Sequence, residues 1–232
     1  MNCEEKKMIL NEKTKMISIG GGCYSNILLT RLDKLTGFNI RVPGPIDNLR
    51  SLHGIDGSLK LFDGSLQEQL LGEKASFQIE KKKAGKQSFD EVDLNFIFED
   101  FVIIHNDYRK EKYKANLKTR FENLKAFYQE AKINPNYFFL YTLCQFDRKS
   151  IGRLKIIKQK FQELGIDNKI IFVGTSIAPV KLENETKSNT ENWPDFNWPE
   201  WTEVFGKNYI ILRNCDYYDL GAKLFLTKLK EL

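Results

Sequence analysis

The sequence predicts a three-layer α/β domain, in which a mainly parallel central sheet is flanked by helices and carries a β-hairpin insertion. Two observations lead to this prediction. Apolar segments of strand length alternate along the chain with segments whose apolar residues recur every three or four positions, as they do on one face of a helix. Strands that are parallel neighbours need crossover connections, and right-handed crossovers place helices on both faces of the sheet.

The first predicted unit is a strand, a glycine turn and a helix. Residues 16–19 form a short apolar run that stops at three consecutive glycines. Leucines then recur at helical spacing over residues 28–35, and Gly37 is suited to end this helix in the left-handed conformation.

The middle of the chain is predicted to contain the insertion. Residues 40–56 are rich in glycine and proline and are expected to form a loop with at most a short helix. A capping-box pattern at Ser65 predicts a short helix. Apolar and polar residues then alternate over 75–99 on both sides of a lysine-rich turn, which indicates a β-hairpin. The unbroken apolar run 101–104 instead suits a strand buried in the central sheet, which would deliver His105 to its end.

The second half of the chain continues the alternation of strands and helices. The clearest helix has an apolar stripe that steps by four, three, four and three residues, formed by Leu117, Phe121, Leu124, Tyr128 and Ala131. The remaining predicted elements are strands at 137–143, 169–173 and 209–212, helices at 150–165 and 218–232, and a long loop at 178–200.

The composition is that of a folded globular domain. The chain has 232 residues, of which 41% are hydrophobic and 29% charged, and we expect a single domain over residues 1–232. No run approaches the roughly 18 apolar residues that a membrane-spanning helix needs, and residues 1–15 lack the apolar core of a secretory signal. We therefore expect a cytoplasmic protein that does not bind a membrane.

Charge and residue spacing argue against several kinds of partner. The net charge of +5 is small, and the lysine cluster at 81–86 is expected to be the solvated tip of the hairpin rather than a nucleic-acid site. No close set of histidine, cysteine and acidic residues predicts a metal site, and no glycine-rich nucleotide motif predicts a cofactor. Free thiols are expected of the four widely separated cysteines, Cys3, Cys23, Cys144 and Cys215.

Parallel sheets place ligand sites at the carboxyl ends of their strands. We therefore expect the polar residues that follow the predicted strands to meet on one edge of the sheet. Five segments would lie at this edge: 20–23, 105–107, 142–144, 174–176 and 214–216.

Cys23 is the strongest candidate for chemistry. It follows the glycine turn and opens a helix, where unpaired amides and the helix dipole favour an anion and so lower the pKa of a thiol. The amides of the turn, at Gly20, Gly21 and Gly22, can also hold the oxyanion that forms when a thiolate attacks a carbonyl. The alternative is a small buried cysteine after glycines that only let the chain turn.

His105 is the candidate general base, because it ends a predicted strand and a neutral imidazole accepts a proton near physiological pH. Its alternative is a histidine that is hydrogen-bonded at the edge of the core. Three acids are candidates to orient the imidazole, namely Asp107, Asp47 and Asp216. Each of them can equally be a turn or capping residue, and the sequence leaves the choice open.

Four motifs resemble, in order, those of a bacterial family of unknown function that is catalogued as papain-like cysteine peptidases. In that family a strand leads into Leu-Gly-Ser-x-Cys, and Pro-Phe-Asp-Trp, His-Asp and a Tyr-x-Arg-Arg-x-x-Arg-Phe helix follow. The similar segments here are 17–23, 45–48, 105–107 and 113–124, the last of which contains Arg120 and Phe121. The resemblance spans roughly residues 16–215, although Gly21-Gly22 replace a Ser-Asn or Ser-Asp pair.

The resemblance implies that Cys23 is the nucleophile, His105 the base and either Asp107 or Asp47 its orienter. It also implies that Arg120 belongs to the ligand-binding residues. The family label would suggest a papain-like α+β fold, which is the alternative to the three-layer sheet. A nucleophile after the first strand of a three-layer sheet is instead similar to the SGNH-type esterases.

We therefore expect a cysteine peptidase, or another thiol-dependent hydrolase or acyltransferase, that acts on a peptide or small-molecule substrate. The alternative is a non-catalytic binding module, or a family member that has lost its chemistry. Such a module would hold an anionic or sugar ligand at the glycine turn and would serve bacterial surface-polysaccharide assembly.

Overall fold

A central sheet of five parallel strands forms the middle layer of the protein, in a computed structural model of the chain. The structure describes residues 10–20, 23–47, 49–51, 64–71, 78–81, 94–98, 101–103, 110–143, 148–176, 209–213 and 219–231. The strand order is β2-β1-β7-β8-β9. The strands are β1 (Lys15–Gly20), β2 (Arg41–Val42), β7 (Tyr137–Leu143), β8 (Ile170–Ser176) and β9 (Tyr209–Arg213).

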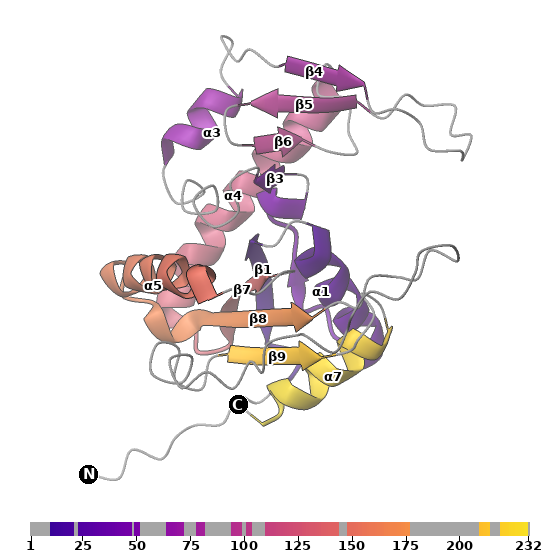
Figure 1. Cartoon of the computed structure of the whole chain (residues 1–232), viewed down its shortest axis with the longest axis vertical. Coiled ribbons are helices and arrows are strands. Elements are labelled where there is room, and N and C mark those ends of the chain that lie inside the picture. Colours follow the sequence, from indigo (N-terminus) through magenta and orange to yellow (C-terminus); the bar gives the residue numbers. More distant parts are fainter. Residues whose placement is uncertain are drawn as a thin grey trace.

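Helices cover both faces of this sheet, which confirms the predicted three-layer fold (Figure 1). One face packs against α1 (Cys23–Thr36) and α7 (Asp219–Leu229), and the other against α4 (Glu111–Ile133) and α5 (Arg148–Glu163). Successive strand residues point to opposite faces, so Met16 packs in the core under α1 and α7 whereas Ile17 packs in the core under α4 and α5.

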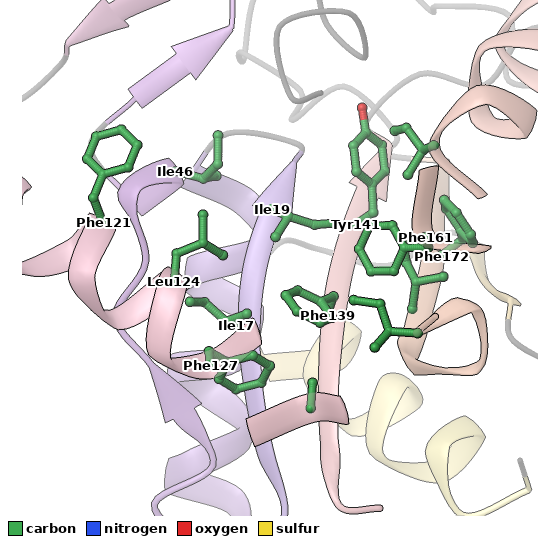
Figure 2. Close-up of a cluster of buried hydrophobic side chains, with 14 of the residues drawn as sticks. Ile17, Ile19, Ile46, Phe121, Leu124, Phe127, Phe139, Tyr141, Phe161 and Phe172 are labelled. Carbon is green, nitrogen blue, oxygen red and sulfur yellow. The ribbon is translucent and has the colours of Figure 1, made fainter. Parts of the chain in front are cut away.

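Aromatic rings dominate the core between the sheet and the helices α4 and α5 (Figure 2). The ring of Phe139 is fully buried and makes edge contacts with Phe127 at 5.1 Å and with Phe161 at 5.0 Å between centroids. The buried stripe of α4 is Leu117, Phe121, Leu124, Phe127 and Ala131. Phe127 therefore takes the place that the sequence analysis gave to Tyr128, which lies half-buried beside it.

Two glycines end helices as predicted. Gly37 follows α1 with φ of 69°, and Gly165 closes the turn after α5 with φ of 71°. Residues with a side chain rarely adopt this left-handed conformation, so the periodic apolar pattern and the glycine together mark each helix end. The capping-box pattern also correctly marks a short helix, α3 (Gly64–Leu71).

A second sheet of four antiparallel strands is inserted between β2 and α4. Its order is β3-β6-β5-β4, with β3 (Leu49–Ser51), β4 (Gln78–Lys81), β5 (Leu94–Phe98) and β6 (Phe101–Ile103). The pairing of β4 with β5 confirms the hairpin that was predicted over 75–99. The inserted sheet lies beyond the carboxyl end of β1 and beside the first half of α4 (Figure 1).

Two parts of the sequence interpretation are wrong here. The run 101–104 does not belong to the central sheet, because β6 pairs antiparallel with β3 and β5. An apolar run shows that a strand is buried, and it does not show which sheet buries it. Residues 40–56 are also more than a loop, since they include β2, β3 and the 3₁₀ helix η1 (Pro45–Asp47).

The predicted long loop at 178–200 lies outside the described residues. Among the helices that the structure does describe, none has both the length and the apolar character that crossing a bilayer requires.

Truncating Phe139 is expected to test the aromatic core. Phe139→Ala should lower the free energy of unfolding by about 3 to 5 kcal/mol, because it leaves a cavity between the rings of Phe127 and Phe161 that cannot collapse fully. Urea unfolding followed by fluorescence measures this change. Ile156→Ala is the matched control: Ile156 is 50% exposed on α5, and its truncation should cost less than about 1 kcal/mol. Equal effects of the two changes would contradict the packing described.

Candidate functional site

The carboxyl ends of β1 and β7 meet where the connections of the sheet change direction. The chain leaves β1 through α1 to reach β2 on one side, and it returns through α4 to β7 on the other side of β1. Because α1 and α4 lie on opposite faces, the two strand ends are flanked by helices that diverge. Sheets of this strand order bind their ligands at this point. Gly20 ends β1 there, and Cys23 is the first residue of α1.

The end of β1 is irregular. Ser18 pairs with Leu140, whereas Gly20 already pairs with Tyr141, so two steps along β1 match one step along β7. Such bulges bend a strand end and are frequent beside functional sites. Gly20 is required here because an added Cβ would lie 2.1 Å from the ring of Tyr141. That ring stands at the carboxyl end of β7 (Figure 2).

Two buried hydroxyls hold the carbonyl of Gly20. The Ser25 hydroxyl, from the first turn of α1, donates to this carbonyl oxygen, and the Thr142 hydroxyl, from β7, donates to it at 3.3 Å. The two hydroxyl oxygens are 2.5 Å apart, and both side chains are fully buried. We call Ser25 and Thr142 the hydroxyl clasp. It joins the strand end, the helix start and the neighbouring strand at one atom.

A second polar cluster holds the segment that leads from β2 to the inserted sheet. The Oδ2 atom of Asp47 accepts hydrogen bonds from Arg41 at 2.7 Å, Arg120 at 2.6 Å and the Gly44 amide at 3.3 Å. The Asp47 side chain is only 3% exposed. Arg120 also donates to the Gly44 carbonyl at 3.2 Å, and Asn123 donates to the Pro43 carbonyl at 3.0 Å. We call Arg41, Asp47 and Arg120 the aspartate clamp.

The clamp fixes η1 against its neighbours. Arg120 lies on α4 and Arg41 on β2, so the single carboxylate of Asp47 ties a helix and a strand to the 3₁₀ turn. The same turn contacts α1 and β1. The family resemblance implied that Arg120 binds a ligand. Within the described residues its guanidinium binds Asp47, Gly44 and Asn116.

Some of the predicted site residues lie together in the structure, and others lie outside the described residues. Gly20, Asp47 and the backbone of Cys23 lie at the carboxyl edge of the central sheet. The candidate residues Gly21, Gly22, His105, Asp107 and Asp216 and the side chain of Cys23 lie outside the described residues.

The predicted strand before His105 lies in the inserted sheet and not in the central one. That strand, β6, is not a strand of the parallel sheet, so the common edge of parallel strands does not bring His105 to the carboxyl edge of the central sheet. The antiparallel ladder gives a different relation. Ile103 of β6 pairs with Leu49 of β3. Asp47 lies two residues before Leu49, and His105 lies two residues after Ile103. The described end of β6 is thus next to the chain that leaves η1.

The role of Ser25 was not predicted from the sequence, and Thr142 was predicted only to lie at a strand end. A signal was present for both, because Thr142 is a polar residue inside the apolar run of β7 and Ser25 falls on the inner face of the predicted helix with Leu28, Leu29 and Leu32. A buried hydroxyl needs a hydrogen-bond partner. The sequence could not show that the partner is shared. No group of three metal-binding side chains occurs in the described part of the chain.

The comparisons with known proteins return no relative. No protein-family model, no curated protein and no solved structure matches the chain. The geometry of the site and the resemblance of its motifs are what bear on its function.

Removal of the Asp47 charge is expected to loosen the clamp. Asp47→Asn should lower the free energy of unfolding by about 3 kcal/mol, because two guanidinium groups would then face each other without a counter-charge. Urea unfolding measures the loss. Glu111→Gln breaks the exposed pair of Glu111 with Lys114 and should cost less than about 0.5 kcal/mol. If Asp47→Asn folds as stably as the unmodified chain, the clamp is not a structural tie and Asp47 is free to orient a histidine.

Proposed function

We propose that the protein is a thiol-dependent hydrolase or acyltransferase whose nucleophile is Cys23, with peptides or amides as first substrates and esters as second. One observation carries this proposal: the cysteine is the first residue of a 14-residue helix at the point where the connections of a parallel sheet change direction. Cys23 therefore lies where such sheets bind ligands, at the end of a helix that favours negative charge.

The helix supports the ionised form of the thiol. The first turn of α1 has backbone N–H groups without intrahelical partners, and the aligned peptide dipoles place partial positive charge at this end. Cysteines at helix N-termini commonly have a lowered pKa, so a larger fraction is thiolate at neutral pH. The same N–H groups, with those of the glycine turn, are the proposed donors to the oxyanion.

The reaction would proceed in two steps. The Cys23 sulfur attacks the acyl carbonyl, His105 accepts the thiol proton, and the same proton passes to the leaving amine or alcohol as the carbon–nitrogen or carbon–oxygen bond breaks. Water then attacks the thioester, with His105 as base, and releases the acid and the free thiol. A second acceptor in place of water would make the protein an acyltransferase.

The roles of His105 and of the orienting acid follow from the motif resemblance and from the position of β6. What favours His105 is that the described end of β6 pairs with β3 beside η1, and η1 contacts α1. Asp107 or Asp47 would orient the imidazole. The hydrogen bonds described for the Asp47 carboxylate all fall on Oδ2, so this role would use its Oδ1 atom. We further propose a cytoplasmic location, where a free thiol stays reduced.

The reactivity of Cys23 tests this proposal directly. The chain is treated with iodoacetamide between pH 5 and pH 9, and the labelling of each cysteine is followed by mass spectrometry. At pH 6 Cys23 should be labelled at least about tenfold faster than free cysteine, because a lowered pKa raises its thiolate fraction. Its labelling rate should stay high to a pH well below about 8.5, where the labelling of free cysteine falls.

The other three cysteines, Cys3, Cys144 and Cys215, are controls within the same molecule. Replacement of the proposed base, His105→Ala, should move the labelling profile of Cys23 to higher pH and abolish turnover of a thioester or ester substrate. A Cys23 that labels no faster than free cysteine at any pH would sink the proposal and leave the ligand-binding module as the better function.

A further inference from the structure

We propose that Ser25 and Thr142 are positioning residues for the oxyanion donor of this site. By holding the Gly20 carbonyl in the interior, the hydroxyl clasp would turn the N–H of the same peptide bond toward the carbonyl that Cys23 attacks. This inference rests on the proposed function, since it concerns the step in which the thiolate adds to a carbonyl.

The hydroxyl clasp fixes the direction of the Gly20 carbonyl. Its oxygen accepts from two hydroxyls whose side chains are fully buried, so it points into the interior between α1 and β7. A peptide bond is planar and trans, and its N–H therefore lies on the side opposite to its carbonyl. An inward carbonyl at Gly20 would therefore direct the N–H of the same peptide bond away from the interior.

The bulge explains why hydroxyls are needed at this position. A regular ladder would satisfy a strand carbonyl with the amide of the neighbouring strand, but the register shift between Ser18 and Gly20 interrupts the ladder. Buried carbonyls need a partner, and the clasp supplies two donors from different elements. Each hydroxyl has one proton, so only two of the three contacts within the clasp are made at once.

The chemistry of two reagents can separate orientation from reactivity. Iodoacetamide is attacked at a saturated carbon: the carbon–sulfur bond forms, iodide leaves, and no tetrahedral oxyanion develops. With p-nitrophenyl acetate the sulfur adds to the carbonyl, an oxyanion forms, and p-nitrophenolate leaves as it collapses to the thioester. Loss of one well-placed donor typically slows reactions of the second kind by about 10² to 10³.

A matched pair of substitutions isolates the hydroxyl of Thr142 in the full chain. Thr142→Val keeps the shape of the side chain and removes the hydroxyl, whereas Thr142→Ser keeps the hydroxyl and removes the methyl group. For each variant the rate of p-nitrophenolate release is divided by the rate of iodoacetamide labelling at Cys23, after subtraction of the release by Cys23→Ala. Urea unfolding of each variant checks that it is folded under the assay conditions, because Cys23 of an unfolded chain still reacts with both reagents as an ordinary thiol.

The expected result is a ratio that falls about tenfold or more in Thr142→Val and stays within about twofold in Thr142→Ser. Ser25→Ala should lower the ratio as Thr142→Val does, and it serves where the valine variant does not fold. An unchanged ratio in both Thr142→Val and Ser25→Ala would overturn the inference while leaving Cys23 as the nucleophile. If the unmodified chain reacts with neither reagent faster than free cysteine, the proposed function fails and the inference falls with it.

Discussion

The parallel pairing of β1 with β7 is the constraint on which the rest of the structure depends. Gly20 and Thr142 are hydrogen-bonded although 122 positions separate them in the chain. Two parallel strands cannot be joined by a tight turn, because the chain must travel back from the carboxyl edge to the amino edge before it can pair again. Here α1, β2, the inserted sheet and α4 all lie within that return path.

The long helix α4 connects the two sheets. Its second half buries Leu124, Phe127 and Ala131 against the central sheet, and its first half lies beside the inserted strands (Figure 1). Between the two halves, Arg120 binds Asp47 of the turn that joins β2 to β3. The clamp thus anchors the insertion near its origin.

Much of the fold could be predicted because the spacing of apolar residues in each segment shows which of its residues are buried. The apolar stripes of α1 and α4, the left-handed glycines Gly37 and Gly165, and the alternation in β4 and β5 are local signals, and the structure agrees with each of them. β6 shows the limit of such signals. Its apolar run correctly predicted a strand, but the choice between the two sheets depends on partners that lie far away in the chain.

The candidate site shows the same division between features that the local sequence predicts and contacts that depend on distant parts of the chain. The turn after the first strand and the cysteine that opens the next helix are adjacent in sequence, so local reasoning was enough to single out Gly20 and Cys23. The hydroxyl clasp and the aspartate clamp join residues from separate elements, and no periodicity predicts that Thr142 meets Ser25 or that Arg120 meets Asp47. Short apolar patterns are compatible with many pairings of strands and helices. Packing of the whole chain selects one of them, because buried polar atoms must each find a partner in the same arrangement that fills the core.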